Sequence, residues 1–367
     1  MTFEFLVKIF GEGGVVALSG LAIGLAFGVL AQRSRFCMRS ATVEFFRAAA
    51  GPKTAVWLLG FAAAVAGTQG LISGGLLDVS NARQLTGQGS LSGAIIGGLM
   101  FGAGMVLARG CTSRILVLSA TGNLRALVTG LILTIVAQSA LRGFLSPIRQ
   151  GLASLWTVSG EAARDVTAVL GIADGMPIIL GTVLLLIAGS LALHRGVSRW
   201  VMVGTTGVGL MIAAGWWTTY VISSQSFNPV AVKSISFIGP SADTLMGFIN
   251  ESHLPLVFDS GLVPGVFAGS FLAALLAREL KWQCFSIEES PMPRYIIGAV
   301  LMGFGGMLAG GCAVGAAMTG TSVFSLTAWI AMFAMWAGGG ITDYWVDRRS
   351  SAPVVEGFSV EETIPAR

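Results

Sequence analysis

The stretch Ile96–Cys111, IGGLMFGAGMVLARGC, recurs without a gap at Ile297–Cys312 as IGAVLMGFGGMLAGGC. Eight positions are identical, and both copies end in a Gly-Cys pair, Gly110-Cys111 and Gly311-Cys312. Each copy has the pattern of an apolar helix that runs into a loop of small residues with one thiol. Self-similarity of this kind indicates two structural repeats within the chain.

The composition around the two copies is that of an integral membrane protein. Hydrophobic residues form 54% of the chain, charged residues form 11%, and the mean hydropathy is +0.80. A soluble domain usually carries about a quarter charged residues. Glycine accounts for 51 of 367 residues, and small residues let helix backbones approach closely in lipid. We therefore expect an all-α polytopic membrane protein, and the small net charge of +4 argues against a nucleic-acid partner.

Apolar stretches of the length of a membrane span recur along the chain, since a span needs about 20 mostly apolar residues. We expect about nine transmembrane helices, at roughly 13–31, 55–77, 91–109, 126–145, 176–194, 199–219, 261–277, 294–309 and 325–343. Shorter pieces follow the Gly-Cys pairs, at about 112–121 and 313–323. Irregular backbone at membrane depth needs protein or a watery cavity to satisfy its polar groups. These pieces are therefore expected to be re-entrant half-helices.

Lys and Arg in short loops predict the orientation, because cytoplasmic loops carry an excess of both. With nine spans, the basic segments fall on one face, which places the N-terminus outside and the C-terminus in the cytoplasm. The basic segments lie at Arg33–Arg39, His194–Arg199, Arg278–Lys281 and Arg348-Arg349. We expect a multi-pass protein of the bacterial inner membrane. Residues 1–349 form a single transmembrane transporter domain in this interpretation, and 350–367 a disordered cytoplasmic tail.

The repeat extends beyond the two Gly-Cys helices. The first repeat covers about 13–145 and the second about 261–345, with connecting spans in 146–260. Under the nine-span count the two Gly-Cys loops enter from opposite faces, as an internal inverted repeat predicts, with a binding site near the midplane. One feature conflicts with an inverted repeat: under the nine-span count, the corresponding spans 13–31 and 261–277 cross the membrane in the same direction.

Cys111 and Cys312 are the leading candidates for the site. Gly110 and Gly311 remove a side chain next to each thiol and let the loop face a narrow passage. A free cysteine in an apolar protein is often only a small buried filler. The duplication of Gly-Cys at matched helix ends favours the functional interpretation, and we expect the two thiols to meet in the middle of the bilayer.

Cys37 lies in the basic stretch RSRFCMRS, where Arg35 and its neighbours could favour a thiolate. The alternative is ordinary positive-inside anchoring with an incidental cysteine. Arg109 and Arg114 bracket Cys111 and are either anchors at the end of a span or groups that attract an anion to the thiol. Cys284 has no counterpart in the other repeat, and its role is open.

The residue inventory excludes several kinds of site. Only two histidines exist, His194 and His253, and no CxxC or zinc-ligand spacing is present. We therefore expect no metal and no cofactor, and a protein that is not an enzyme. The apolar stretches contain no acidic residue near their centres, so a carboxylate proton relay has no candidate.

Several motifs together resemble the YeeE/YedE family of sulfur transporters. They are Arg35-Phe36-Cys37, Ala108–Cys111, Ala268–Ala274 and Gly298–Gly315. The resemblance implies an inner-membrane transporter of thiosulfate or another reduced-sulfur or selenium species. It further implies a small cytoplasmic sulfur-carrier partner of the YeeD/TusA type, and functional cysteines at Cys37, Cys111 and Cys312. The sequence departs from the family pattern at Arg109, where a further glycine is common.

The function expected from these features is uptake of thiosulfate or a related reduced-sulfur anion along a relay of thiols. Conduction needs shallow, repeated sites. Cys312 would take the ion from the outer side, Cys111 would receive it near the centre, and Cys37 would release it inside. Two alternatives stay open: a membrane thiol–disulfide redox protein, which needs bridgeable cysteines, and a docking partner for a soluble sulfur carrier. Ion coupling and oligomeric state are not predicted.

Overall fold

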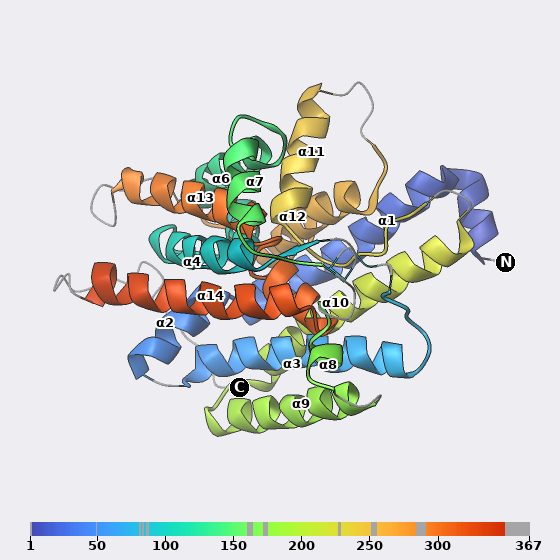
Figure 1. Ribbon diagram of the computed structural model, residues 1–367, viewed down its shortest axis with the longest axis horizontal. Helices are drawn as coiled ribbons and strands as arrows, with labels where there is room; N and C mark the ends of the chain where they lie inside the picture. Colours follow the sequence, from blue (N-terminus) through green and yellow to red (C-terminus); the bar gives the residue numbers. More distant parts are fainter. Residues whose placement is uncertain are drawn as a thin grey trace.

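The computed structural model describes residues 2–48, 50–80, 82, 84–85, 88–159, 164–171, 175–226, 229–250, 255–283 and 291–348. Cys284 and the expected tail at 350–367 lie outside these residues. The described chain is almost entirely helical (Figure 1), which confirms the all-α class. Its one strand pair is antiparallel, with Gly89 opposite Val158 and Ser90 opposite Thr157.

The elements follow one another from α1 to η2, where η denotes a π-helix. They are α1 (Thr2–Ser34), α2 (Met38–Ala48), α3 (Pro52–Ser73), β1 (Gly89–Ser90), α4 (Leu91–Leu107), α5 (Thr112–Ala120), α6 (Leu124–Arg142), α7 (Ser146–Ser154), β2 (Thr157–Val158), α8 (Val166–Val169), α9 (Met176–His194), α10 (Arg199–Gln225), α11 (Ile238–Asn250), α12 (Phe258–Leu276), α13 (Met292–Leu308), η1 (Gly315–Gly320), α14 (Leu326–Thr342) and η2 (Asp343–Arg348).

Each of the nine apolar stretches lies on a helix, namely α1, α3, α4, α6, α9, α10, α12, α13 and α14. Seven segments of the described chain are long and apolar enough to cross a membrane by length and composition. The helices α13 and α14 are not among these seven segments, and each has 17 residues, so the count of nine spans stays a prediction. The pieces expected to be re-entrant are α5 and η1, with nine and six residues. Their re-entrant course also stays a prediction.

Helices α1 and α12 are in backbone contact along a seam of six glycines. A Cβ on Gly20, Gly24 or Gly28 would overlap the backbone of α12 at positions 258–270, and the equivalent atom on Gly261, Gly265 or Gly269 would overlap α1 at positions 17–25. Small residues at this spacing allow the close approach that drives helix association in lipid. Contacts advance along both helices together, so α1 and α12 run parallel. An inverted repeat does not describe this pair.

The Gly-Cys helices α4 and α13 pack in the opposite sense. Gly93 lies against Leu308, and Gly104 lies against Gly298, so the two helices are antiparallel. This pair has the relation that an inverted repeat predicts. Each helix also packs on the last helix of the other repeat, α4 on α14 and α13 on α6. Helices of the two expected repeats therefore pack against each other, and Figure 1 shows α13, α4 and α14 side by side with their axes nearly aligned.

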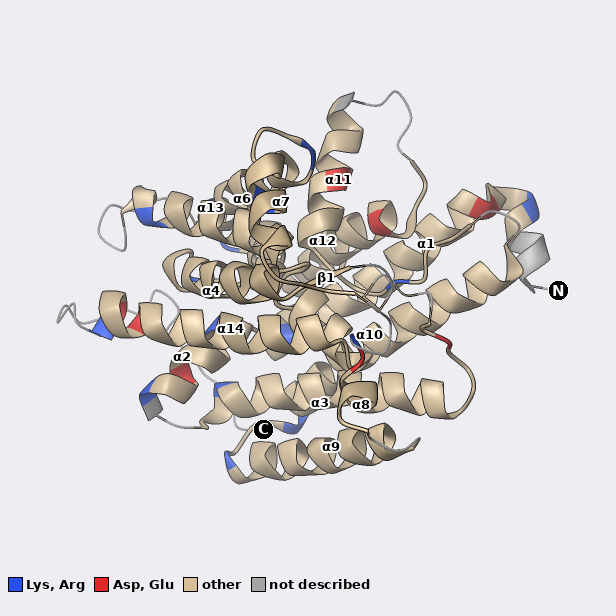
Figure 2. Ribbon diagram, viewed as in Figure 1, with Lys and Arg blue, Asp and Glu red and all other residues tan. Residues whose placement is uncertain are grey.

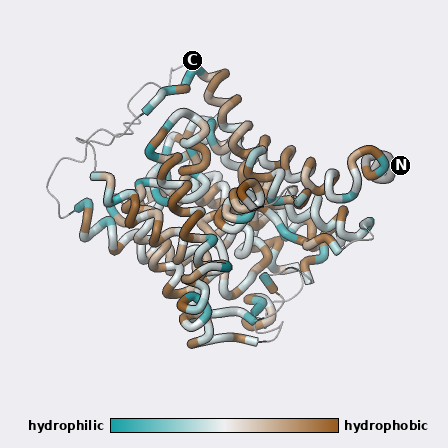
Figure 3. Tube along the Cα trace, turned by 90° about the horizontal axis from the view of Figure 1, so that it is seen from above, coloured by the Kyte–Doolittle hydropathy of each residue, from teal (hydrophilic) through white to brown (hydrophobic). Residues whose placement is uncertain are grey.

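Charge and hydropathy are distributed as a membrane protein requires. Lys, Arg, Asp and Glu lie mainly at helix ends and in connections (Figure 2), and apolar residues recur along the helices (Figure 3). The helix α9 exposes large apolar side chains such as Leu186 (68%) and Ile187 (58%). Exposed apolar surface of this extent suits lipid contact. The chain is thus a multi-pass membrane protein.

Candidate functional site

The three thiols have the same local setting, at the N-terminal end of a short helical segment. Cys37 precedes α2, Cys111 precedes α5, and Cys312 precedes η1. Each carbonyl accepts the first helical hydrogen bond, from Ala41 at 3.3 Å, Ile115 at 2.9 Å and Ala316 at 2.8 Å respectively. Free amides and the helix dipole give such ends a positive potential that suits an anion.

Tight turns deliver the chain to these positions. The residues Arg35, Arg109 and Gly310 each have positive φ, at 51°, 54° and 82°, and each stands two positions before its cysteine. Such residues commonly end a helix. The turn ends the long helix and lets a second, short helix start close to the thiol.

The glycines next to the thiols differ in how strictly they are required. A Cβ on Gly311 would lie 2.8 Å from the backbone nitrogen of Ala316, which is too close for any side chain. At Gly110 the nearest atom would be Cγ1 of Ile115 at 3.2 Å, and that side chain can adjust. Glycine is therefore a steric requirement at 311 and a preference at 110.

Two of the three thiols are in contact. The Cys37 and Cys111 sulfurs are 3.8 Å apart, and the Cys111 sulfur lies 3.4 Å from the Ser113 hydroxyl. Both cysteines are buried, at 7% and 1% exposure. We expected Cys111 to meet Cys312, but no such contact occurs between these two described residues. Cys37 takes that place because the turn after α1 brings it beside the end of α4.

Cys312 lies in the same buried core as Cys37 and Cys111 but has different neighbours. Its sulfur accepts a hydrogen bond from the Gly315 backbone amide at 3.4 Å, and it is fully buried. Ser236 lies against Gly315, and the Thr319 hydroxyl donates to the Ile235 carbonyl at 2.6 Å. Polar backbone is thus satisfied by protein at this depth, as a membrane interior demands.

The sequence predicts no role for the segment beside Cys312, which falls within the region of connecting spans, 146–260. Residues 229–236 have no regular secondary structure, and Ser234, Ile235 and Phe237 are buried. Lys233 in this segment forms an ion pair with Asp259 at 2.7 Å. The alternation of small polar and apolar residues in Ser234–Phe237 was the signal that this segment enters the core.

On one side of the thiol pair, a polar network joins three elements. Glu279 accepts from the Gln32 amide at 3.0 Å and lies 3.9 Å from Arg35, while Arg114 donates to Gln32 at 3.4 Å. Arg114 is also within electrostatic range of both thiols. Arg35, by contrast, has a side chain that is 54% exposed and points to Glu279. Arg114 is therefore the better placed of the two toward the sulfurs.

Two buried carboxylates form ion pairs that the sequence analysis did not predict. Both lie near the end of the protein that the sequence analysis expects to be cytoplasmic. Asp343 accepts two hydrogen bonds from Arg47, at 2.8 and 2.6 Å. Asp347 accepts from Arg294 at 2.6 Å and lies 3.9 Å from Arg39. Paired in this way, both carboxylates act as fixed charges that hold α2, α13 and η2 together. No proton relay is implied by them.

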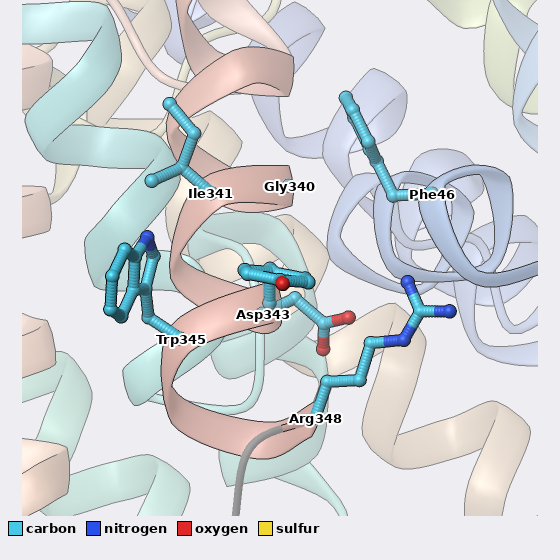
Figure 4. Close-up of a pocket in the computed structure, with 7 residues that line it drawn as sticks. Phe46, Gly340, Ile341, Asp343, Trp345 and Arg348 are labelled. Atoms are coloured by element: carbon cyan, nitrogen blue, oxygen red, sulfur yellow. The ribbon is translucent and has the colours of Figure 1, made fainter.

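A shallow groove lies over the same end of α14. It is lined by Phe46, Gly340, Ile341, Asp343, Tyr344, Trp345 and Arg348 (Figure 4). The Arg348 guanidinium carbon lies 6.0 Å from the Tyr344 ring centroid. None of the three thiols lines this groove. Aromatic rings at a helix end are typical of the membrane–water boundary.

Arg109 stands apart from the other arginines near the thiols. Its backbone is left-handed at φ 54°, where the second repeat has Gly310, a conformation that costs a residue with a side chain about 1–2 kcal/mol. Its Nε is buried without a hydrogen-bond partner. No ion pair within the described residues involves its guanidinium. This combination of strain and an unpaired charge needs an explanation.

Comparison with known proteins decides the family. The family model described as sulphur transport matches residues 33–341, which include Cys37, Cys111 and Cys312. The chain belongs to the sulphur transport family. This confirms the resemblance to the YeeE/YedE transporters.

Curated relatives within the sulphur transport family are thiosulfate transporters by name. The thiosulfate transporter TsuA of Spirochaeta thermophila is 28% identical over 331 residues, which are 85% of this chain and 94% of that protein. The thiosulfate transporter TsuA of Escherichia coli (strain K12) is 25% identical over 336 residues, which are 88% of this chain and 92% of that protein. A probable transporter YedE of the same organism is 32% identical over 131 residues, 32% of each chain.

Within the described residues, no three His, Cys, Asp or Glu side chains are grouped so that they could hold an ion. The groups that the structure places around the three cysteines are hydroxyls, backbone amides and arginines.

Proposed function

We propose that this protein takes up thiosulfate or a closely related reduced-sulfur anion across the bacterial inner membrane, along Cys312, Cys111 and Cys37. The observation that carries the proposal is the 3.8 Å contact between the Cys37 and Cys111 sulfurs in a chain of the sulphur transport family. Thiosulfate has a soft terminal sulfur and two negative charges. Thiols are weak donors and polarisable neighbours for such an atom.

The helix ends supply the second half of the interaction. Cys37 and Cys111 lie at the starts of α2 and α5, where the helix dipole favours negative charge, and these helix ends help to stabilise a passing dianion. Weak, repeated contacts of this kind suit conduction, because an ion bound too tightly would not leave. In this order Cys312 receives the ion, Cys111 holds it at the centre, and Cys37 releases it inward.

The test is uptake of labelled thiosulfate into proteoliposomes by the wild type and by Cys37→Ser, Cys111→Ser and Cys312→Ser. Serine keeps a donor of similar size and removes the soft sulfur, so each variant should lose about tenfold or more in uptake, about 1.4 kcal/mol in transition-state terms. Cys284→Ser is the matched control, since it removes a thiol without a counterpart in the repeat. Wild-type rates in both Cys111→Ser and Cys312→Ser would refute the relay.

The Cys37–Cys111 contact also favours a second candidate, a membrane thiol–disulfide protein. The two thiols could be oxidised by exchange with a small-molecule disulfide: the Cys37–Cys111 bond forms as the S–S bond of that molecule breaks, and its two sulfurs leave as thiols with the two protons. Alkylation of free thiols followed by mass analysis distinguishes the candidates. A Cys37–Cys111 disulfide that accumulates during turnover supports the redox function, and two free thiols throughout support transport without chemistry.

The expected partner, a small cytoplasmic sulfur carrier of the YeeD/TusA type, belongs to the same proposal. It would collect sulfur at the Cys37 side, which requires that side to be cytoplasmic, with the N-terminus outside and the C-terminus inside. Labelling of single-cysteine variants with an impermeant reagent in intact cells tests the orientation. Sulfate, sulfite and selenite as competitors in the uptake assay identify the preferred species.

A further inference from the structure

Three arginines other than Arg114 lie near the ends of the segments that carry the thiol pair. Arg39 is two residues beyond Cys37, Arg109 is two residues before Cys111, and Arg294 donates to the Val106 carbonyl in the last turn of α4 at 3.5 Å. Arg39 is within electrostatic range of Cys37, Arg109 and Asp347. These three residues are called the arginine cluster below.

Charge in the arginine cluster is not balanced. Asp347 is shared by Arg39 and Arg294, at 3.9 and 2.6 Å, while Asp343 is already held by two hydrogen bonds from Arg47. Three guanidinium groups therefore face one carboxylate, which leaves an excess of two positive charges. A thiosulfate-like dianion carries the charge that would neutralise this excess.

The arginine cluster also contains hydrogen-bond donors that have no acceptor within the described residues. The Nε atoms of Arg39, Arg109 and Arg294 are all buried without a hydrogen-bond partner. Buried polar groups are nearly always paired, and a buried charge is stable only with a partner. Arg109 carries the clearest deficit, because it has neither a hydrogen bond nor an ion pair within the described part of the chain.

The position of Arg109 in the repeat strengthens this point. The left-handed turn that it occupies is filled by Gly310 in the second repeat, at φ 82°. Glycine adopts this conformation without strain. The chain thus tolerates a strained arginine at one repeat only, beside the two thiols that touch.

We propose that the arginine cluster, centred on Arg109, is an oxyanion subsite for the hard oxygens of the transported ion, next to the Cys37–Cys111 pair that meets its soft sulfur. Arginine forks bind tetrahedral oxyanions through paired N–H groups. The Arg39 and Arg294 side chains are 22% and 16% exposed, whereas the thiols are more deeply buried. The subsite therefore forms the more exposed part of a bipartite site, and the thiols form its more deeply buried part. This inference rests on the proposed function.

The substrate class follows from the two parts of the site. An ion with both a terminal soft sulfur and three oxygens uses both parts. Sulfate fits only the arginine cluster, and thiocyanate, which has no oxygen, fits only the thiols. Sulfate should therefore compete with thiosulfate at the arginine cluster, and thiocyanate should compete with it at the thiols.

Arg109→Gly is the decisive variant, because it gives the left-handed turn its preferred residue and should leave thermal stability unchanged or higher. In proteoliposomes we expect the KM for thiosulfate to rise by about tenfold or more, the loss typical of a charge-assisted hydrogen bond. Inhibition by sulfate should weaken by a similar factor, and inhibition by thiocyanate should be unchanged. Arg33→Gln, which removes an exposed charge at the end of α1, is the matched control and should behave as the wild type.

A tetrahedral oxyanion could also come from a lipid phosphate, so the assay is run in zwitterionic vesicles and in vesicles with anionic lipid. A KM and sulfate inhibition in Arg109→Gly equal to the wild-type values in both vesicles would overturn the subsite. An effect of the variant confined to vesicles with anionic lipid would assign Arg109 to lipid and also overturn it. Absence of thiosulfate uptake by the wild type would instead refute the proposed function itself.

Discussion

The glycine seam between α1 and α12 yields a quantitative prediction for Gly24→Ala. The added methyl group would overlap the Leu262 carbonyl oxygen and crowd the backbone nitrogen of Val266. Backbone atoms cannot rotate away as side chains do, so the helices must separate by an amount on the order of 1 Å. Overpacking of this kind costs about 1–3 kcal/mol, and the upper part of that range applies.

A gain in helix propensity offsets part of this cost. Alanine is better than glycine within a helix by about 1 kcal/mol. The net destabilisation of Gly24→Ala is therefore about 2 kcal/mol, which corresponds to a fall of about 4–8 °C in Tm for a large domain. Thiosulfate uptake should fall as well, because α1 ends three residues before Cys37 and displaces it from Cys111 when it moves.

The assay is thermal unfolding of purified protein in detergent, followed by tryptophan fluorescence. Gly189→Ala in α9 is the matched control, since an added Cβ there meets no atom within 4 Å. That variant keeps the propensity gain without the clash, so its Tm should equal or exceed that of the wild type. A Gly24→Ala protein that melts at or above the wild-type temperature would show that the seam is not in backbone contact.

Three further predictions concern the ends of the helices. Asp343→Asn removes the carboxylate charge that pairs with Arg47 and should lower the melting temperature. The expected cost is about 3 kcal/mol, the lower end for breaking a buried ion pair, because the Arg47 side chain is partly exposed. Gly315→Ala places a Cβ against the Ser236 side chain, so uptake should fall and Ser236→Ala should restore part of it; no rescue would count against that contact. Gly310→Ala meets no neighbouring atom but must hold φ 82°, and should cost about 1 kcal/mol in unfolding experiments through backbone strain alone.

Hydropathy was sufficient to locate every long helix, because membrane helices must be apolar over their whole length. The predicted helix starts at 176 and 199 agree with α9 and α10, while the stretch ending at 77 overshoots α3, which ends at Ser73. Glycines after Ser73 stop the helix although the sequence remains apolar there. The number of spans is a property of the bilayer as well as of the chain, and it was not settled by helix positions.

The site was predictable only where the sequence repeats itself. Duplication pointed to Cys111 and Cys312, and the resemblance added Cys37. Which thiols touch depends on the turn after α1, and local sequence does not encode that geometry. Contacts across the fold were equally hidden, since Arg47 and Asp343 are 296 residues apart in sequence, and the ion pair is visible only once α2 and α14 are adjacent.

The glycine seam limits how a substrate can be moved. With backbone against backbone, α1 and α12 have no layer of side chains on which one helix could slide along the other. An elevator or rocking-bundle cycle moves one repeat as a rigid body against its mate, and this pair joins the two repeats. We therefore expect a stationary frame, in which rotamers of the thiols and small shifts of the short helices admit the ion. Spin labels on α1 and α12 should report one unchanging distance through turnover, and two populated distances would disprove the stationary frame.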